Sequence, residues 1–389
     1  MEQLFIFSGK RIKETSLDFF RYKYADIKWQ GRMLGIVGPR GVGKTTMMLQ
    51  YAKANLDIDK TLYVSADQLY FSRHSLLEVA DKFSKMGGQH LLIDEVHHYP
   101  NWSIELKEIF DTYSDMQVVF SGSSILDICK GAADLSRRAP IYEIQGLSFR
   151  EYLKLFHNID VPAFSLEQVL SHEALIPGIA HPLPIFTDYL RRGYYPFGRD
   201  VGFDQELLQV VNRTMEADIP QYASLNVSVG YRLKQLMMVV AESVPFKPQM
   251  TTLAQVTGIS RNDLPDYLYY MERAGMIAQL RDVTIGVRGL GKLEKIYLDN
   301  TNLAFVLADA QPNIGNLRET FFFNQMRVNH KVRASKISDF EVEGHTFEIG
   351  GKSKGKKQLA SVSDGYVVKD DIEQGYANVI PLFHFGLLY

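Results

Sequence analysis

The strongest constraint on this chain is residues 38–45, which read GPRGVGKT and fit the phosphate-binding loop pattern G-x-x-x-x-G-K-T without a gap. Residues 32–37 form a short, mostly apolar run that predicts a buried strand, and residues 46–52 have helical spacing without a breaker. The glycines therefore lie where a strand passes into a helix N-terminus, the context in which backbone N–H groups bind phosphate. This context argues against a glycine-rich turn that only resembles the motif.

The residue types in this loop suit a triphosphate. Residues without a Cβ let the backbone N–H groups wrap closely around phosphate oxygens. We expect the Lys44 ammonium to reach the β- and γ-phosphates and the Thr45 hydroxyl to ligate Mg²⁺. The predicted ATP-binding residues are Gly38, Pro39, Arg40, Gly41, Val42, Gly43, Lys44, Thr45 and Thr46.

A second stretch, HLLIDE at residues 90–95, is an apolar strand that ends in two carboxylates and is typical of a Walker B strand. We expect Asp94 to hold Mg²⁺ beside Thr45, and Glu95 to polarise the water that attacks the γ-phosphate. The alternative is a strand capped by solvated acids, which the upstream loop disfavours.

Two histidines, His97 and His98, follow these acids. Adjacent residues on a turn are expected to point apart, and no third ligand is evident nearby. They are therefore interpreted as packed or solvated side chains rather than as a metal site.

Alternating strands and helices predict an α/β fold, a P-loop parallel sheet with helices on both faces. Apolar runs at residues 61–65, 116–124 and 141–144 predict further strands, and residues 75–85 and 103–113 predict helices. Before the loop, the aromatic spacing over residues 12–27 predicts an amphipathic helix.

Polar residues beyond these strands complete the predicted catalytic set. In an ATPase with an added strand between the loop strand and the Walker B strand, that added strand ends in a γ-phosphate sensor. Ser123 is the predicted sensor and Ser124 the alternative. Arg137 or Arg138 is a candidate for reaching a γ-phosphate in its own or a neighbouring subunit; the alternative is a surface arginine pair.

The composition indicates the class of protein and its cellular compartment rather than the reaction that it catalyses. The chain has 389 residues, of which 46% are hydrophobic and 23% charged, as in ordinary globular proteins of two or three domains. A net charge of −2 gives no global argument for nucleic acid or membrane. A single cysteine, no uninterrupted run of 18 apolar residues and no signal-peptide pattern favour the cytoplasm.

Residues 38–45, 92–102, 121–124 and 146–153 together resemble the uncharacterised prokaryotic AAA-type ATPases. Those proteins pair an N-terminal ATPase domain with a C-terminal domain of unknown function, and the resemblance covers essentially the whole chain. It implies the additional-strand, catalytic-glutamate class of P-loop ATPase. Arg137 and Arg138 fall where that family often has an arginine.

Four domains are predicted: a P-loop ATPase domain at 1–155, a helical lid or connector at 156–228, a winged helix at 229–308 and a nuclease-like domain at 309–389. In the third, residues 252–272 predict two helices with a turn at Gly258, and a hairpin follows. Such a module can read DNA or contact a protein, and phosphates would repel the acids on its second helix, which favours the protein partner. These acids are Asp263, Asp266 and Glu272.

The last domain is predicted as a small restriction-endonuclease-like α/β fold in which Glu319, Asp339 and Glu348 form a possible second metal site. That fold's lysine, two residues after the second acid, is replaced by Gly350, which counts against cleavage. A nearby lysine group either contacts DNA phosphates or forms a solvated loop. It consists of Lys352, Lys354, Lys356 and Lys357.

The sequence thus predicts a Mg²⁺-dependent ATPase that acts as an ATP-driven switch on a DNA or protein partner, with homo-oligomer formation left open and no membrane role. One alternative is an ATP-regulated, metal-dependent DNA nuclease. The other is a non-catalytic ATP-binding regulator, against which Glu95 argues because a binding switch does not need that carboxylate.

Overall fold

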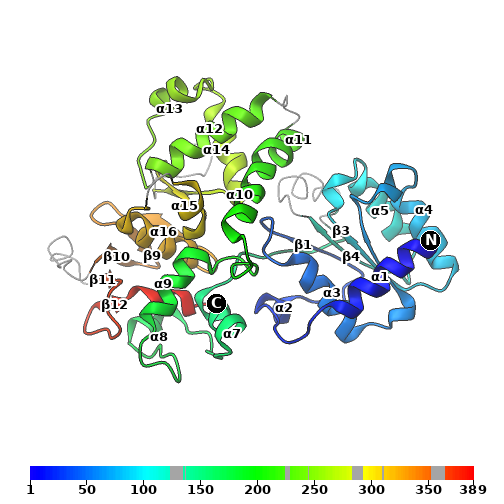
Figure 1. Ribbon diagram of the computed structural model, residues 1–389, viewed down its shortest axis with the longest axis horizontal. Coiled ribbons are helices and arrows are strands. Elements are labelled where there is room, and N and C mark those ends of the chain that lie inside the picture. Colours follow the sequence, from blue (N-terminus) through cyan, green and yellow to red (C-terminus); the bar gives the residue numbers. More distant parts are fainter. Residues whose placement is uncertain are drawn as a thin grey trace. The chain divides into compact units, whose positions relative to one another are not determined.

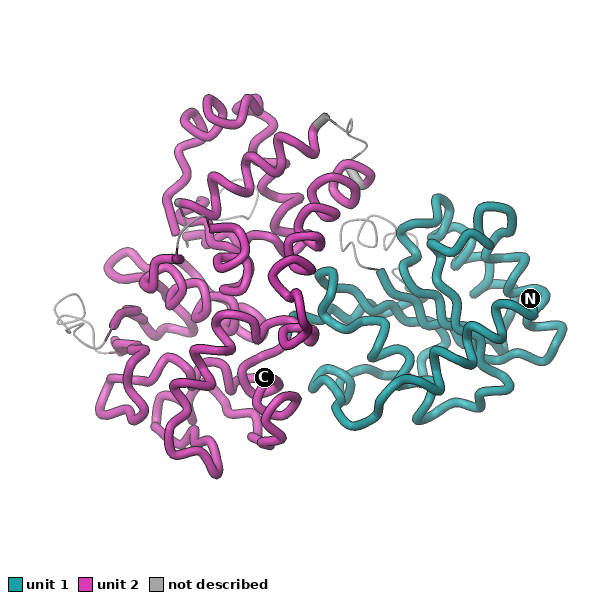
Figure 2. The backbone as a smooth tube through the Cα atoms, in the orientation of Figure 1, with its two compact units in different colours: residues 1–146 teal, residues 147–389 magenta. Residues whose placement is uncertain are grey.

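The computed structural model describes residues 1–122, 135, 137–223, 228–243, 245–282, 292–308, 311–351 and 364–389. The chain divides into two compact units, residues 1–146 and 147–389 (Figure 2). The sequence placed the end of the first domain at residue 155. The structure divides the chain earlier, because Phe149, Tyr152 and Leu153 pack into the core of the second unit.

The first unit is built on a five-stranded sheet in which every pairing is parallel, with the order β2-β3-β4-β1-β5. β4 lies between the loop strand β1 and the acid-bearing strand β3, as an additional-strand ATPase requires. Leu34 and Ile36 of β1 are fully buried, because both faces of a parallel sheet are covered. The strands are β1 (Met33–Val37), β2 (Thr61–Ser65), β3 (His90–Asp94), β4 (Gln117–Gly122) and β5 (Ile141–Glu143).

Helices cover both faces of this sheet, which confirms the predicted fold class (Figure 1). In Figure 1, α3 lies on one side of the strands and α4 and α5 lie on the other. The Ser75 hydroxyl accepts from the Glu78 N–H and so begins α4 as an N-cap. The helices are α1 (Glu2–Glu14), α2 (Lys23–Asp26), α3 (Lys44–Asn55), α4 (Leu76–Lys85) and α5 (Trp102–Thr112), with 3₁₀ turns at Ile58–Lys60, Leu69–Ser72 and Val96–His98.

The predicted helix over residues 12–27 is wrong. α1 ends at Glu14, and Thr15 is already extended. The backbone carbonyls after Thr15 accept hydrogen bonds from α3 instead. The Gln50 side-chain amide donates to Ser16 O at 3.0 Å and to Phe19 O at 2.7 Å. Tertiary partners therefore replace the local helical bonds that the aromatic spacing suggested.

The second unit begins with helices that pack around one large apolar core. Its helices are α7 (Phe149–His157), α8 (Leu166–Leu170), α9 (Leu183–Arg192), α10 (Phe203–Arg213), α11 (Ile219–Ala223), α12 (Ser228–Ser243), α13 (Met250–Thr257), α14 (Leu264–Arg273), α15 (Thr301–Leu307) and α16 (Ile314–Met326), with a π-helical turn at Thr214–Asp218. None of the described helices is long and apolar enough to cross a membrane.

The elements expected of a winged helix occur in the expected order. α13 and α14 are separated by a turn in which Gly258 has a φ of 64°, and an antiparallel hairpin of β6 (Ile277–Arg281) and β7 (Leu293–Leu298) follows. Pro265 lies in the first turn of α14, so the helix starts after Arg261 rather than at it. The assignment of this segment as a winged helix stays a prediction.

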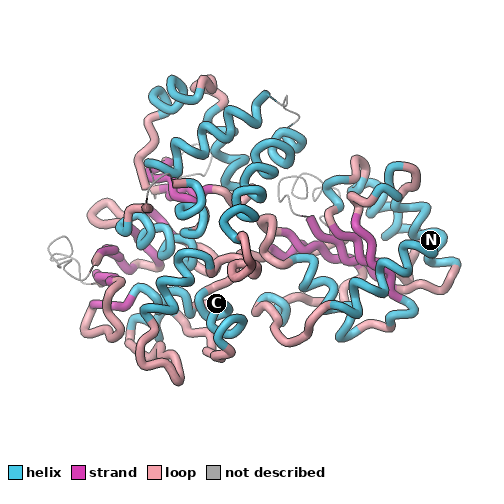
Figure 3. Tube along the Cα trace, in the orientation of Figure 1, coloured by secondary structure: helices cyan, strands magenta, loops and turns pink. Residues whose placement is uncertain are grey.

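A second five-stranded sheet ends the chain, with the order β12-β11-β10-β9-β8. Figure 3 draws all strands in magenta, those of this sheet included. β10, β11 and β12 pair in parallel, whereas β9 pairs antiparallel with both β8 and β10. The strands are β8 (Val332–Ala334), β9 (Phe340–Val342), β10 (His345–Gly350), β11 (Gly365–Lys369) and β12 (Val379–Pro381). A 3₁₀ segment, Leu382–Leu387, follows and is buried.

Candidate active site

The phosphate-binding loop follows the carboxyl end of β1, and its glycines are required by geometry. A Cβ on Gly38 would lie 2.2 Å from the carbonyl oxygen of Ile144, a distance that no side chain tolerates. Gly41 and Gly43 have φ values of 84° and 96°, and Gly43 caps α3 in the left-handed conformation. The sequence motif therefore forms the predicted turn from strand to helix.

Lys44, the first residue of α3, is folded back over this loop. Its Nζ donates to the carbonyl oxygens of Gly38 at 2.9 Å and of Pro39 at 2.8 Å, and the residue is 5% exposed. The ammonium group is thus held at the concave side of the loop, where a phosphate would exchange its anionic oxygens for these carbonyls.

Asp94 at the end of β3 is the hydrogen-bonding centre of the site. Its Oδ2 accepts from the Thr45 hydroxyl at 2.6 Å and from the Tyr63 hydroxyl at 3.0 Å, and its Oδ1 accepts from the Ser121 hydroxyl. Burial raises the pKa of Asp94 and the nearby Glu95 charge raises it further, while these hydrogen bonds oppose both. The loop and the acid strand therefore meet as the sequence predicted.

Glu95 follows Asp94 with a left-handed backbone, at a φ of 52°. This conformation is unfavourable for a residue with a Cβ, and such strain gathers at functional sites. A 3₁₀ turn, Val96–His98, comes next and directs both imidazoles toward the Glu95 carboxylate. His97 Nε2 lies 3.4 Å and His98 Nε2 lies 3.9 Å from Glu95 Oε2.

The prediction that these two histidines point apart is therefore wrong. Their ring centroids are 4.1 Å apart. Burial lowers the pKa of His97 to about 3 against an opposing effect of Glu95, so this ring is neutral near pH 7. Within the part of the chain that the structure describes, Glu95, His97 and His98 are the group of three potential ligands whose atoms lie within 4.8 Å of one another.

Sequence reasoning missed Ser121 and Tyr63. The β3–β4 register pairs Ile93 with Phe120, so Ser121 comes next to Asp94 across the sheet. The strand order, together with the first polar residue after the apolar stretch at 118–120, would have been the signal. The predicted sensors, Ser123 and Ser124, lie outside the described residues.

Arg21 is a third residue that the sequence did not indicate. It is 5% exposed and donates to Val42 O in the phosphate loop at 2.7 Å. The same guanidinium donates to Gln145 O at 2.7 Å and to Gly146 O at 2.9 Å. Arg21 therefore connects the loop to the segment that ends the first unit.

Arg137 and Arg138 precede β5, whereas the phosphate loop follows β1. Because β1 and β5 are parallel and Val37 pairs with Glu143, these arginines lie toward the opposite ends of the strands. Arg138 makes a two-fold contact with Asp111, at 2.9 and 3.0 Å. The structure does not bring the pair to Lys44 within this unit.

In the second unit, Glu319 and Asp339 converge on a lysine. Lys295 Nζ, from β7, lies 3.0 Å from Glu319 Oε2 and 3.4 Å from Asp339 Oδ1. Burial would lower the pKa of Lys295, but the two carboxylates raise it above its usual value. Glu348 Oε2 accepts from the Ser338 hydroxyl at 2.5 Å, and Asp339 Oδ2 accepts from Ile349 N at 2.9 Å.

These three acids are close, but among the described residues they do not form a group with three ligand atoms within 4.8 Å. Burial, and then the charge of Glu319, raise the pKa of Asp339. The predicted phosphate-contacting lysines Lys352, Lys354, Lys356 and Lys357 lie outside the described residues.

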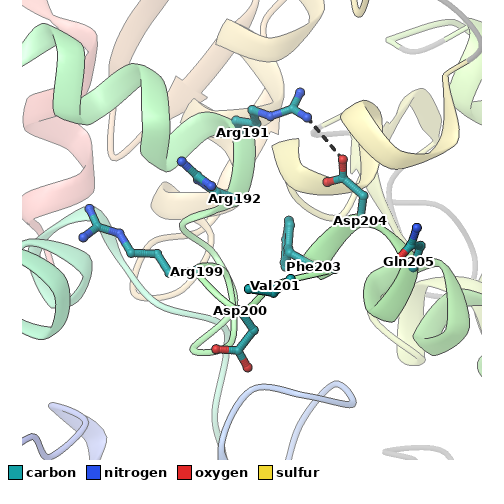
Figure 4. Close-up of a pocket in the computed structure, with 9 residues that line it drawn as sticks. Arg191, Arg192, Arg199, Asp200, Val201, Phe203, Asp204 and Gln205 are labelled. Atoms are coloured by element: carbon teal, nitrogen blue, oxygen red, sulfur yellow. Dashed lines mark hydrogen bonds and ion pairs between the residues drawn. The ribbon is translucent and has the colours of Figure 1, made fainter.

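A separate pocket of about 430 Å³ in the second unit is lined by arginines near the start of α10 (Figure 4). Arg191 pairs there with Asp204 at 3.2 Å. Arg192 and Arg199 both contact Asp188, at 2.7 and 3.7 Å. The positive charge of this pocket is therefore largely balanced by neighbouring carboxylates.

Two family models match the chain. Residues 30–153 match an AAA domain, and residues 183–313 match a domain of unknown function (DUF8612). The first match agrees with the loop, the acid strand and the 5-1-4-3-2 strand order, read from β5 to β2. The chain therefore carries an AAA-type P-loop domain, a fold that supports nucleotide binding and hydrolysis.

Individual relatives are more distant. The uncharacterized protein MJ1637 of Methanocaldococcus jannaschii is 25% identical over 268 residues, which are 63% of this chain and 56% of that relative. The Walker-type ATPase PABY2304 of Pyrococcus abyssi has a TM-score of 0.46 at 12% identity, covering 74% of this chain and 95% of that one. AMPPCP-bound DnaA from Aquifex aeolicus has a TM-score of 0.27 at 14% identity, covering 69% of this chain and 88% of that one.

Proposed function

Because the first unit carries an AAA-type P-loop domain, we propose that this protein binds ATP with Mg²⁺ and hydrolyses it. The observation that carries the proposal is the 2.6 Å contact between Thr45 Oγ1 and Asp94 Oδ2. It brings a loop hydroxyl and a strand carboxylate to one point, and both are hard oxygen ligands of the kind that Mg²⁺ prefers. A loop whose first position accepts only glycine supports the phosphate part of the proposal.

Each residue then has a defined task. Backbone N–H groups of residues 38–46, apart from Pro39, which has none, would hold the phosphates, and Lys44 would exchange two loop carbonyls for β- and γ-phosphate oxygens. Thr45 and Asp94 would hold Mg²⁺, which supplies charge neutralisation on those oxygens when it is bound. Tyr63 and Ser121 orient the Asp94 carboxylate through their hydroxyls.

Glu95 is assigned as the general base. Glu95 follows Asp94 directly, its side chain is 19% exposed and its backbone is left-handed, at a φ of 52°. A base in this position accepts a proton from the water that attacks the γ-phosphate. A protein that used ATP only to hold one conformation would have no need of this carboxylate.

The second unit is assigned as the output of the switch. Nucleotide turnover in the first unit would change how the second engages DNA or a protein partner in the cytoplasm. The helical connector, the winged helix and the nuclease-like domain, at 156–228, 229–308 and 309–389, are the proposed parts of this output. Arg137 and Arg138 are left as candidates for action across two subunits of a homo-oligomer, since each precedes β5.

The test is phosphate release from ATP with Mg²⁺, measured alone and with single- or double-stranded DNA. Glu95→Gln should bind ATP but lose turnover, and Glu108→Gln, an exposed carboxylate on α5, is the matched control. Unchanged hydrolysis in Glu95→Gln would remove Glu95 as the base. Stimulation by DNA would indicate a DNA partner, whereas indifference to DNA would favour a protein partner.

A second candidate function is metal-dependent DNA cleavage in the second unit. One observation favours it: Lys295 brings an ammonium group to Glu319 and Asp339, although the sequence has Gly350 where the lysine is expected. If this activity exists, Mg²⁺ or Mn²⁺ should support cleavage that is lost in Asp339→Ala. Cleavage that persists in Asp339→Ala would point to a contaminant.

A further inference from the structure

We propose that Glu95, His97 and His98 form a binding site for a divalent ion of the Zn²⁺ class, distinct from the Mg²⁺ position at Thr45 and Asp94. Occupation of this site would stop ATP turnover while leaving ATP bound. The inhibitory half of this inference rests on the proposed function of Glu95, whereas the binding half does not.

The distances fit a tetrahedral ion. Ligand atoms about 2.0–2.1 Å from Zn²⁺ in a tetrahedron lie about 3.4 Å apart. His97 Nε2 and Glu95 Oε2 are 3.4 Å apart, and His98 Nε2 is 3.9 Å from the same oxygen. A change of about 0.5 Å in the distance between His98 Nε2 and Glu95 Oε2 would bring this pair to the tetrahedral spacing. The candidate ligand atoms of all three residues lie within 4.8 Å of one another.

The His98 ring also has an unsatisfied hydrogen-bonding atom. Its Nε2 is buried and has no hydrogen-bond partner within the described part of the chain. A buried polar nitrogen in this state costs free energy until water or an ion reaches it. The position of this nitrogen, 3.9 Å from Glu95 Oε2, therefore favours a ligand between the two atoms.

The donor set selects the class of ion. Two imidazole nitrogens and one carboxylate oxygen suit Zn²⁺ and its neighbours, whereas Mg²⁺ prefers oxygen ligands alone. Thr45 and Asp94 offer only oxygen atoms. The first unit would therefore hold two cation positions of different chemistry.

An ion can reach the site from solvent. His98 lines an open pocket of about 640 Å³ together with Tyr99, Pro100 and residues 66–69 at the end of β2. The side chains of Glu95 and His98 are 19% and 18% exposed, while that of His97 is 1% exposed. His97 would thus form the buried wall of the site, and His98 would connect it to this pocket.

Metal binding would act on turnover through Glu95. An ion on Oε2 occupies the lone pair that would otherwise accept the water proton, so the base is blocked. The loop residues that hold the phosphates are not ligands of this ion. The zinc-bound protein should therefore behave like Glu95→Gln, binding ATP without hydrolysing it.

The binding test uses the full chain after removal of metal with a chelator. Co²⁺ is titrated as a spectroscopic probe, because a tetrahedral N/O site gives strong visible absorption, and Zn²⁺ is then added to displace it. His98→Asn should weaken Co²⁺ binding by on the order of 10-fold or more. His181→Asn, whose side chain is 79% exposed in the second unit, is the matched control and should keep wild-type affinity. Equal binding by wild type and His98→Asn would overturn the site.

The activity test adds Zn²⁺ at saturating Mg²⁺ and ATP. Wild type should lose turnover but retain a fluorescent ATP analogue, and His98→Asn should need on the order of 10-fold more Zn²⁺ for the same fractional loss. Equal inhibition of both would show that Zn²⁺ acts elsewhere and would overturn the inhibitory half. If wild type binds Co²⁺ through His98 but never hydrolyses ATP, the proposed ATPase function fails and the metal site stands.

Discussion

The Thr45 hydroxyl donates to Oδ2 of Asp94 over 2.6 Å, and it joins the first turn of α3 to the end of β3. In a magnesium site this hydroxyl would turn its oxygen to the ion, so its removal should affect turnover more than folding. Thr45→Ala should reduce phosphate release by on the order of 100-fold. Its cost to the free energy of unfolding should be only about 1 kcal/mol, the value of one hydrogen bond.

Thr45→Ser is the matched control for this prediction, because serine keeps the hydroxyl and removes only a methyl group. It should retain turnover within a few-fold of wild type and the same requirement for Mg²⁺. Turnover that is equal in Thr45→Ala and Thr45→Ser would mean that the hydroxyl does not serve the metal.

Arg21 should prove to be a positioning residue of the phosphate loop. Its guanidinium donates to Val42 O, Gln145 O and Gly146 O, and all three carbonyls would lose this donor in Arg21→Met. We expect a loss of about 3 kcal/mol in the free energy of unfolding and weaker ATP binding. Denaturant unfolding and titration with a fluorescent ATP analogue measure the two effects.

The control for Arg21 is Lys10→Met, which removes a cation whose side chain is 70% exposed and should change stability by less than about 0.5 kcal/mol. If Arg21→Met unfolds more easily but binds ATP with unchanged affinity, Arg21 supports the fold alone and does not position the loop.

The sequence predicted those parts of the site whose functional residues are adjacent in the chain. A strand precedes the loop at 38–45 and a helix follows it, and both can be predicted from the local sequence. The pair Asp94–Glu95 likewise lies between a strand and a turn. Ser121 and Tyr63 were missed because their approach to Asp94 depends on strand register, which no single strand encodes. Arg21 was missed because its partner at Gly146 is 125 residues away.

The wrong predictions have a common cause as well. The aromatic spacing at 12–27 is compatible with a helix, but Gln50 and Lys53 supply bonds to the carbonyls of that segment, so the helix is not needed. The reading of His97 and His98 assumed an ordinary turn, whereas the left-handed Glu95 redirects the chain. In both cases a tertiary contact or a rare backbone angle outweighs the local pattern.

Lys295 should be the counter-ion of the acid cluster in the second unit. Lys295→Met leaves Glu319 and Asp339 facing each other without their cation, and we expect a loss of about 2 kcal/mol, allowing for the partial exposure of the lysine. If these acids can hold a metal, Mn²⁺ should raise the melting temperature of Lys295→Met by more than it raises that of wild type.

Lys247→Met is the control for this prediction, since Lys247 pairs with Glu294 near the same strand and its side chain is 62% exposed. It should show neither effect. A Lys295→Met variant that Mn²⁺ does not stabilise would indicate that the cluster is an ion pair that holds the fold and not a metal site, which would weaken the nuclease alternative.

His384 should make the second unit sensitive to acid. It is 6% exposed in the terminal 3₁₀ segment, and burial, with a smaller effect of His172, lowers its pKa from 6.5 to about 4. Between these two values the unfolded chain binds a proton that the folded chain does not, so stability falls as pH falls. Between about pH 6.5 and about pH 5 this residue should lower the free energy of unfolding by about 2 kcal/mol.

Denaturant unfolding of the full chain at these two pH values measures the difference. His384→Gln should remove that part of the decrease whatever its effect near pH 7, while His181→Gln, at an exposed position, should keep the wild-type decrease. An unchanged pH dependence in His384→Gln would mean that His384 takes up its proton without unfolding.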